Sequence, residues 1–228
     1  MKQKGKLIVI DGGDASGKST QAKLLIQYFR RRKIPVKYVD FPRYTTFHGK
    51  TLGRFLHGDF GQIDQISPYI VSYLYAADRF NAAPLIRKYL DEGNIVIANR
   101  YATSSMGHQA AKLPDKRSQD EYLRWHYELE YKQFGIPKED LVIYLHVPWN
   151  VGLQLLAKKG QRKYLKAKTK DIAEEHHEHQ IRTEKMFLYL CKKNRHWKEV
   201  ECVQDDSILP IKKIHQKVLE VLKRRKFI

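Results

Sequence analysis

The stretch that decides the fold covers residues 7–19 and reads Leu-Ile-Val-Ile-Asp-Gly-Gly-Asp-Ala-Ser-Gly-Lys-Ser. Its first residues are an apolar run typical of a buried strand, and the sequence that follows it is typical of a helix. Between them, residues 12–19 match the pattern G-x-x-x-x-G-K-[ST] completely. Strand, glycine-rich turn and helix start are the context in which this pattern binds phosphate groups. We therefore expect a nucleoside triphosphate to bind here; a chance glycine-rich turn is the alternative.

The residue types in this loop indicate how phosphates would be held. Glycines let the backbone curl so that its N–H groups converge on phosphate oxygens, and the helix that begins near Lys18 adds its positive dipole end. We expect Lys18 to reach the β- and γ-phosphates of ATP, and the hydroxyl of Ser19 to ligate Mg²⁺. The expected ATP-binding residues are Gly12, Gly13, Asp14, Ala15, Ser16, Gly17, Lys18, Ser19 and Thr20.

Length and composition narrow the class of protein. A chain of 228 residues suits one α/β domain, so we expect a single domain over residues 1–228 with a sizeable core. No stretch approaches the roughly 20 apolar residues of a membrane span, and the N-terminal residues read as a strand, not a signal peptide. Cys191 and Cys202 fit neither a disulfide framework nor a metal motif. These features predict a soluble, cytoplasmic protein with no membrane partner.

The net charge of +18 has two interpretations. A basic surface attracts nucleic acid. Alternatively, the charge reflects a site for polyanionic nucleotides, and two of the basic clusters, at 30–33 and 223–226, lie at the ends of expected helices where cations complement the dipole. We prefer the second interpretation and do not expect nucleic acid as a partner.

Apolar, β-rich runs alternate along the chain with segments of helical pattern. Strands are expected at residues 6–10, 36–41, 95–98, 141–147 and 199–203. Helices are expected at residues 18–33, 68–91, 119–134, 149–157, 172–194 and 207–226. Strands separated by helix-length segments predict an α/β fold, here the three-layer fold of P-loop nucleoside triphosphatases with a five-stranded parallel sheet flanked by helices.

Further motifs follow the phosphate loop in a definite order. They are Phe41-Pro42-Arg43-Tyr44, Leu-His-Gly-Asp-Phe-Gly at 56–61, Leu-Tyr-Ala-Ala-Asp-Arg at 74–79 and Asn99-Arg100-Tyr101, with Ser104, Ser105 and Gln109 downstream. Together with residues 11–20, this set resembles the nucleoside monophosphate kinases, and most closely the thymidylate kinase family, over most of the chain. The resemblance implies transfer of the γ-phosphoryl group of ATP to dTMP, giving dTDP and ADP for dTTP biosynthesis, with Mg²⁺ and a homodimeric enzyme.

A nucleoside-binding set follows from the later motifs. Tyr75 and Arg79 are four residues apart on an expected helix and therefore share a face. The resemblance implies that Tyr75 stacks on thymine and Arg79 binds the base or phosphate; by spacing alone, Tyr75 could simply pack in the core. It also implies that Ser104, Ser105 and Gln109 hydrogen-bond the pyrimidine and sugar. A carboxamide suits that task because it both donates and accepts, whereas helix capping is the alternative for the serines.

Charged residues next to expected strand ends form a phosphate-binding set. Arg43 and Arg100 follow strands at the edge where open α/β sheets bind ligands, so they could clamp the dTMP phosphate; a surface salt bridge is the alternative. Phe41 and Pro42 shape the base pocket or merely end a strand. A carboxylate inside a phosphate loop is electrostatically unfavourable, and the resemblance implies that Asp14 orients the sugar and phosphate of dTMP. Capping of the turn is its alternative.

Residues 158–171 lie where the family has a lid over the phosphates. The basic residues of this segment are Lys158, Lys159, Arg162, Lys163, Lys166, Lys168 and Lys170. Family members with a small residue at the position of Ala15 supply a catalytic arginine from the lid, which implies this role for Arg162; a solvated basic loop is the alternative. The expected catalytic residues are Lys18, Asp14, Arg100 and Arg162.

The chain departs from the family pattern in two places. The family usually has a carboxylate near Mg²⁺ at the position of Asn99. Metal binding could then be weaker in this chain, or Asp11 or Asp14 could supply that charge instead. After the lid, Ile172 and several histidines stand where aromatic residues are common. The second departure allows acceptors other than dTMP.

Other interpretations stay open at this stage. One is a kinase for another deoxynucleoside monophosphate or for a deoxynucleoside, although Asn99 removes the obvious general base for a hydroxyl acceptor. Another is a catalytically weak P-loop protein associated with nucleic acid. His176, His177 and His179 could bind a metal ion, but they are too few for a site and no H-E-x-x-H motif occurs. We prefer a solvated helix face for them.

Overall fold

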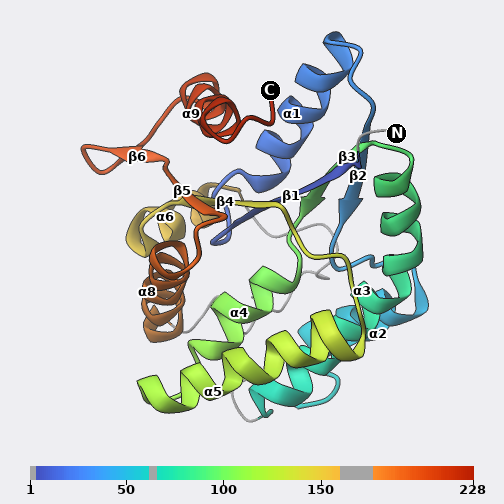
Figure 1. Cartoon of the computed structure of the whole chain (residues 1–228). Helices are drawn as coiled ribbons and strands as arrows, with labels where there is room; N and C mark the ends of the chain where they lie inside the picture. The colour runs from blue at the N-terminus through green and yellow to red at the C-terminus, as the bar shows by residue number, and fades with distance from the viewer. Residues whose placement is uncertain (1–3, 62–65, 160–176) are drawn as a thin grey trace.

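The computed structural model describes residues 4–61, 66–159 and 177–228, and its centre is one parallel sheet (Figure 1). The sheet has the order β2-β3-β1-β4-β5. Its strands are β1 (Lys6–Gly12), β2 (Val36–Asp40), β3 (Ile95–Asn99), β4 (Leu141–His146) and β5 (Trp197–Glu201). All neighbouring strands pair in parallel. The expected fold class is confirmed, and each expected strand ends within two residues of its observed bounds.

Helices cover both faces of the sheet (Figure 1). They are α1 (Lys18–Arg31), α2 (Phe47–Leu56), α3 (Pro68–Asp91), α4 (Ala102–Ala110), α5 (Lys116–Tyr127), α6 (Trp149–Lys159), α8 (His177–Lys193) and α9 (Ile211–Arg224). A π-helical segment, η1 (Glu128–Gln133), follows α5. The short strands β6 (Val203–Gln204) and β7 (Ser207–Ile208) pair in antiparallel fashion.

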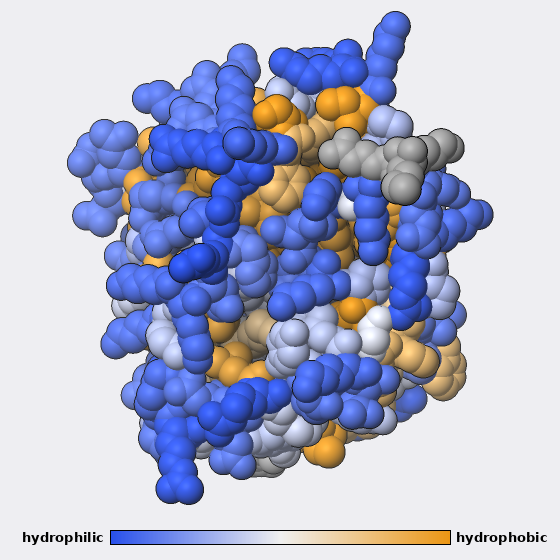
Figure 2. All heavy atoms as spheres, in the orientation of Figure 1, coloured by the Kyte–Doolittle hydropathy of each residue, from blue (hydrophilic) through white to orange (hydrophobic). Residues whose placement is uncertain are grey.

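Two hydrophobic cores lie on opposite faces of the sheet. Alternate residues of β1 enter different cores: Leu7 packs with α3, α4 and α8, whereas Ile8 packs with α1 and α9. Because a central parallel strand is buried on both faces, β1 reads as a continuous apolar run. The surface itself is mostly hydrophilic in the view of Figure 2. Among the described helices, none is long and apolar enough to cross a bilayer.

The helices differ from expectation in four places. The expected helix 119–134 is α5 followed by η1, and α5 begins early because the Asp115 side chain accepts a hydrogen bond from the Ser118 N–H. The helix expected from residue 207 begins at Ile211, because Ser207 and Ile208 pair with β6. Helix α2 was not predicted, and the bounds of α4 were not predicted either.

Candidate active site

The phosphate loop lies between β1 and α1, at the carboxyl edge of the sheet. Gly12 has φ 154°, and a Cβ there would lie 2.7 Å from the carbonyl oxygen of Leu145 on β4, so only glycine fits. The ammonium group of Lys18 lies 3.0 Å from the Gly12 carbonyl oxygen and 2.6 Å from that of Gly13. The loop therefore holds Lys18 over its own backbone at the start of α1.

Two adjacent cavities open at this edge of the sheet. The loop cavity is lined by Asp14, Ala15, Gly17, Lys18, Ser19, Thr20, Asp40, Phe41, Pro42, Tyr44, Asn99 and Arg100. The deep cavity runs toward α3, α4 and α8, and its walls include Tyr75, Arg79, Ser104, Ser105, His108, Gln109 and His179. The residues shared by both cavities are Asp14, Phe41, Pro42, Tyr44 and Arg100. The structure thus brings most of the expected site residues to two neighbouring spaces that meet at a charged pair.

Arg100 and Asp14 form the ion pair at the junction of the cavities. Arg100 directly follows β3 with φ 64°, and its N–H donates to the Ile10 carbonyl oxygen at 3.0 Å. This left-handed turn directs the guanidinium group toward Asp14, where Nη2 lies 2.6 Å from Oδ1. Its Nη1 lies 3.2 Å from Nε2 of His108. Burial, followed by the charge of Arg100, holds the pKa of His108 well below its usual range, so a neutral imidazole accepts this hydrogen bond.

Arg79 is held by a buried partner that was not predicted from the sequence. The guanidinium Nε lies 2.9 Å from Oε1 of Glu130, which also accepts from Nη2. Nη2 donates to Ser105 Oγ at 3.1 Å as well. The side chains of Arg79 and Glu130 are 2% and 0% exposed, so this is an ion pair inside the wall of the deep cavity. Glu130 reaches Arg79 from the π-helical segment η1, 51 residues away in the sequence.

The Asp11 carboxylate and the Ser104 hydroxyl are hydrogen-bonded to each other. The buried Asp11 carboxylate accepts hydrogen bonds from Thr103 Oγ1 at 2.7 Å, from Ser104 Oγ at 2.8 Å and from the Gly12 N–H at 2.9 Å. Asp11 lines neither cavity. These contacts argue against Asp11 as the source of the negative charge that Asn99 lacks. Helix α4 begins at Ala102 with Tyr101 at its N-cap, so the capping alternative for the two serines is wrong as well.

Gln109 presents an unsatisfied group to the deep cavity. The residue is 7% exposed, and its Oε1 atom has no hydrogen-bond partner among the described residues. A buried acceptor without a donor is costly, so a donor on a bound molecule would be its natural partner. Tyr75 is half-buried in the same wall and packs against a small cluster that contains Phe55. Its ring therefore borders the cavity and is not part of the main cores.

Phe41 and Arg43 both follow β2, but only Phe41 lines the cavities. Phe41 packs on Tyr101, with ring centroids 5.7 Å apart, and lines both cavities together with Pro42. Arg43 lines neither cavity. Its Nε lies 2.9 Å from Oδ1 of Asp78, and its Nη2 lies 2.9 Å from Oδ1 of Asn81. Arg43 thus forms a salt bridge with Asp78, which was the alternative to phosphate binding. It lies apart from Asp14 and Arg100, the other residues expected to contact the phosphate, which line both cavities.

Most of the segment expected to be a lid, and part of the histidine run, lie outside the described residues. These include Arg162, Ile172 and His176, and nothing is described of the side chains of Lys158, Lys159 and His177. His179 is described and lines the deep cavity, with Nε2 3.4 Å from Thr183 Oγ1. His179 is half-buried at the cavity wall, so the expectation of a solvated face holds for it only in part.

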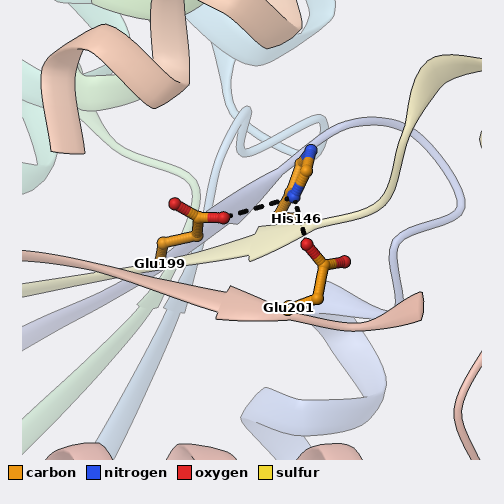
Figure 3. Close-up of side chains that lie close together, drawn as sticks. All are labelled: His146, Glu199 and Glu201. Carbon is orange, nitrogen blue, oxygen red and sulfur yellow. Dashed lines mark hydrogen bonds and ion pairs between the residues drawn. The ribbon is translucent and has the colours of Figure 1, made fainter. Parts of the chain in front are cut away.

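A separate charged cluster, not anticipated from the sequence, occupies the ends of β4 and β5 (Figure 3). Nδ1 of His146 lies 2.7 Å from Oε2 of Glu201 and 3.3 Å from Oε1 of Glu199. Its Nε2 lies 2.9 Å from Oε1 of Glu184 on α8. Burial lowers the pKa of His146, but the hydrogen bonds to Glu184 and Glu201 outweigh it and raise the pKa to about 9. The cluster is therefore an imidazolium among carboxylates that ties β4 to β5 and α8.

Replacing His146 by glutamine is expected to make the stability less dependent on pH. A histidine whose folded pKa is raised contributes stability that is fully present below about pH 6.5 and is lost as pH rises through about 9. Two of the three carboxylates are more than a third exposed, so we expect a contribution of about 2 kcal/mol at most. Urea unfolding of both proteins at pH 6 and pH 10 measures it. An equal difference at the two pH values would contradict the assignment.

The chain matches a known protein family over most of its length. The family model described as Thymidylate kinase matches residues 10–218. The chain belongs to the thymidylate kinase family. It is 31% identical to the thymidylate kinase of Plasmodium falciparum (isolate 3D7) over 178 residues, which cover 78% of each chain. It is 26% identical to the Schizosaccharomyces pombe thymidylate kinase over 223 residues, 97% of this chain and 93% of the relative.

A solved structure has the same fold. The thymidylate kinase from Candida albicans superposes with a TM-score of 0.73 at 23% identity, covering 98% of this chain and 93% of that one. The resemblance expected from the ordered motifs is thus confirmed. As a member of the thymidylate kinase family, the chain is a nucleoside monophosphate phosphotransferase that phosphorylates dTMP, and ATP is the donor that this family uses.

Proposed function

We propose that the loop cavity and the deep cavity bind the two substrates side by side, so that the γ-phosphoryl group of ATP passes directly to the phosphate of dTMP. The observation that carries this proposal is the junction, where Asp14 and Arg100 line both cavities. In-line transfer requires donor and acceptor phosphates within reach of the same charged groups. A phosphate oxygen is already a competent nucleophile, so the site needs no general base.

The residues of the loop cavity suit the polyphosphate of ATP. Lys18 would leave the loop carbonyls for the β- and γ-phosphates, and the N-terminus of α1 would add its dipole. The hydroxyl of Ser19, the carboxylate of Asp40 and the amide of Asn99 form an oxygen-rich set of the kind that Mg²⁺ prefers. Bound there, Mg²⁺ would offset charge on the transferring group. Ser19 is the proposed direct ligand.

Arginines are proposed to neutralise the group in transfer. Arg100 already lies at the junction, and Asp14 holds it there and would orient dTMP. Arg162, from the proposed lid 158–171, would add a second guanidinium group and exclude water. This division assigns one arginine to the sheet edge and one to the lid. Arg43 remains a proposed phosphate contact only if it leaves Asp78 on binding.

The deep cavity suits the nucleoside of dTMP. Tyr75 would stack on the thymine, Phe41 and Pro42 would close the opposite side, and Gln109 would read the base edge. Ser105 and Arg79 are held together by a hydrogen bond and would contact the substrate as a unit. Ser104, whose hydroxyl is engaged with Asp11, would do so only through water or after rearrangement.

Replacing Gln109 by leucine is expected to raise the KM for dTMP by about 10- to 100-fold with little change in kcat. Leucine keeps the volume but removes the hydrogen bonds, and a substrate group left unpaired in a buried site costs about 1–3 kcal/mol. Steady-state kinetics at saturating ATP measure this effect. The matched control is Gln27→Leu on the exposed side of α1, which should leave the KM unchanged. An unchanged KM in the Gln109 variant would remove this residue from the base site.

The acceptor assay tests the proposed reaction as a whole. ADP formation is followed with dTMP, dUMP, dCMP, dGMP and thymidine as acceptors. We expect dTMP to give the highest kcat/KM. Turnover with thymidine alone would favour a deoxynucleoside kinase, preferential turnover with another monophosphate would change the proposed acceptor, and no turnover with any would overturn the proposal.

An exposed apolar stripe on α3 supports a homodimer as part of the proposal. Ile70, Tyr73 and Phe80 are 59%, 51% and 52% exposed, and with the exposed Pro84 they follow the 3-4 spacing of one helix face. Phe80 packs on Phe134 with ring centroids 5.0 Å apart, which widens the stripe. Exposed apolar side chains gathered on one face mark interaction surfaces, and a second copy of the chain is the partner that the family resemblance implies.

Replacing Phe80 by glutamate is expected to convert the dimer into monomers of 26.9 kDa. A charge at this position would have to lose its hydration in a dimer interface. Sedimentation at micromolar concentration measures the mass. Phe47→Glu is the matched control, because Phe47 is 80% exposed on another helix. A monomeric starting protein, or a dimer that survives the Phe80 change, would contradict the interface.

The single domain and the cytoplasmic location that we expect from the sequence are also part of the proposal. The two cores share one sheet, which supports a single domain over residues 1–228. A cytoplasmic location also stays a prediction. A single cooperative unfolding transition would support the single domain. Cell fractionation would test the location.

A further inference from the structure

The amide of Asn99 joins two oxygen groups in the loop cavity. Asn99 is the last residue of β3 and is 6% exposed. Its Nδ2 donates to Oδ1 of Asp40 at 2.7 Å and to Oγ of Ser19 at 3.2 Å. Asp40 is the last residue of β2, and the strand register pairs it directly with Asn99. The amide therefore connects a carboxylate on the neighbouring strand to the hydroxyl proposed to ligate Mg²⁺.

Asp40 is the carboxylate best placed to serve a cation beside Ser19. Asp11 is buried among hydroxyl and N–H donors and lines neither cavity. Asp14 is neutralised by Arg100 at 2.6 Å. Asp40 lines the loop cavity, is exposed, and forms no ion pair within the described parts of the chain. Its negative charge is therefore not yet balanced by a cationic side chain.

The distances suit a carboxylate that acts on the metal through water. Asp40 Oδ1 and Ser19 Oγ contact the same nitrogen atom, so they lie no more than about 6 Å apart. Mg²⁺ binds oxygen at about 2.0–2.1 Å and usually keeps several waters, which places a carboxylate that accepts from a bound water about 4 Å from the ion. Asn99 Oδ1 is buried and without a partner among the described residues, so it is a second acceptor for such a water.

We propose that Asp40 supplies the carboxylate charge of the Mg²⁺ site and that Asn99 is the positioning residue that holds Asp40 and Ser19 together. This inference rests on the proposed function. In the family pattern the carboxylate stands at the position of Asn99, on β3. In this chain the charge has moved to the adjacent position on β2, and the amide has taken the place of the carboxylate.

Exchanging the two side chains between the strands tests the proposal. The variants are Asp40→Asn and the double variant Asp40→Asn with Asn99→Asp. Mn²⁺ serves as the spectroscopic probe, and its binding to the protein with a non-hydrolysable ATP analogue is measured by electron paramagnetic resonance. We expect Asp40→Asn to weaken Mn²⁺ binding by about 10- to 100-fold and the double variant to restore it to within about threefold. Affinity for the analogue without metal should not change.

The controls separate this proposal from the proposed function. Asp91→Asn removes an exposed carboxylate at the end of α3 and tests the general effect of charge on a chain of net charge +18. Wild-type Mn²⁺ affinity in Asp40→Asn, or a double variant as weak as the single one, would overturn the inference even if dTMP is turned over normally. Absence of nucleotide binding in the wild type would instead overturn the proposed function. If Asp40→Asn fails to fold, Asp40→Ser takes its place in the same comparison.

Discussion

Replacing Arg100 by glycine is expected to lower the kcat for dTMP phosphorylation by about 10³-fold while the fold stays intact. The guanidinium group lies at the junction of the two cavities, where charge develops on the transferring phosphoryl group. Loss of one such group costs about 10²–10³-fold or more, and 10³ corresponds to about 4 kcal/mol of transition-state stabilisation. Single-turnover kinetics at saturating substrates measure the loss.

Glycine is chosen because Arg100 has φ 64°. A glycine relieves this left-handed backbone, so a drop in activity with unchanged or higher thermal stability cannot come from local unfolding. Arg100→Lys should recover part of the rate, because lysine keeps the charge but not the fork of donors. Arg54→Ala is the control, since it removes an exposed ion pair between Arg54 on α2 and Asp59. A kcat within tenfold of the wild type in Arg100→Gly would exclude Arg100 from the transfer step.

The sheet could be predicted from the sequence because its strands are continuous apolar runs between turns. Helix α4 shows where this reasoning fails. It consists mainly of small and polar residues, and nearly all of them are buried, so no amphipathic pattern marks it. Its Gly107 allows the Phe187 ring of α8 to approach, since a Cβ there would lie 2.3 Å from the ring. Tertiary packing, not local propensity, therefore defines this helix.

The two arginines at strand ends show what sequence reasoning can say of the site. Arg43 and Arg100 follow β2 and β3 in the same way, and the edge of the sheet was predicted correctly for both. Their directions depend on partners that are distant in sequence: Asp78 holds Arg43 against α3, whereas Asp14 holds Arg100 over the cavities. Pairings across 35 and 86 residues leave no local pattern. The position could be predicted and the side-chain direction could not.

Glu130 is the most consequential of these distant partners, and replacing it by glutamine is expected to lower the free energy of unfolding by about 3–5 kcal/mol. Glutamine keeps the shape but leaves the Arg79 charge uncompensated in a wall where both side chains are almost fully buried. Urea unfolding at pH 7 measures the change. Glu128→Gln is the matched control two residues away. That residue pairs with Lys132 on the exposed side of η1, so its loss should have a much smaller effect.

A double variant separates the structural role of this pair from its role in binding. Arg79→Met with Glu130→Leu removes both buried charges of this pair, so most of the lost stability should return. The base site would then lack the guanidinium group that is hydrogen-bonded to Ser105, so the KM for dTMP should be higher than in the wild type. If both the stability and the KM of the double variant equal those of the wild type, the pair only fills space. Recovery of stability alone would mean that the pair is retained, at a cost in desolvation, because it orients Arg79 toward the nucleotide.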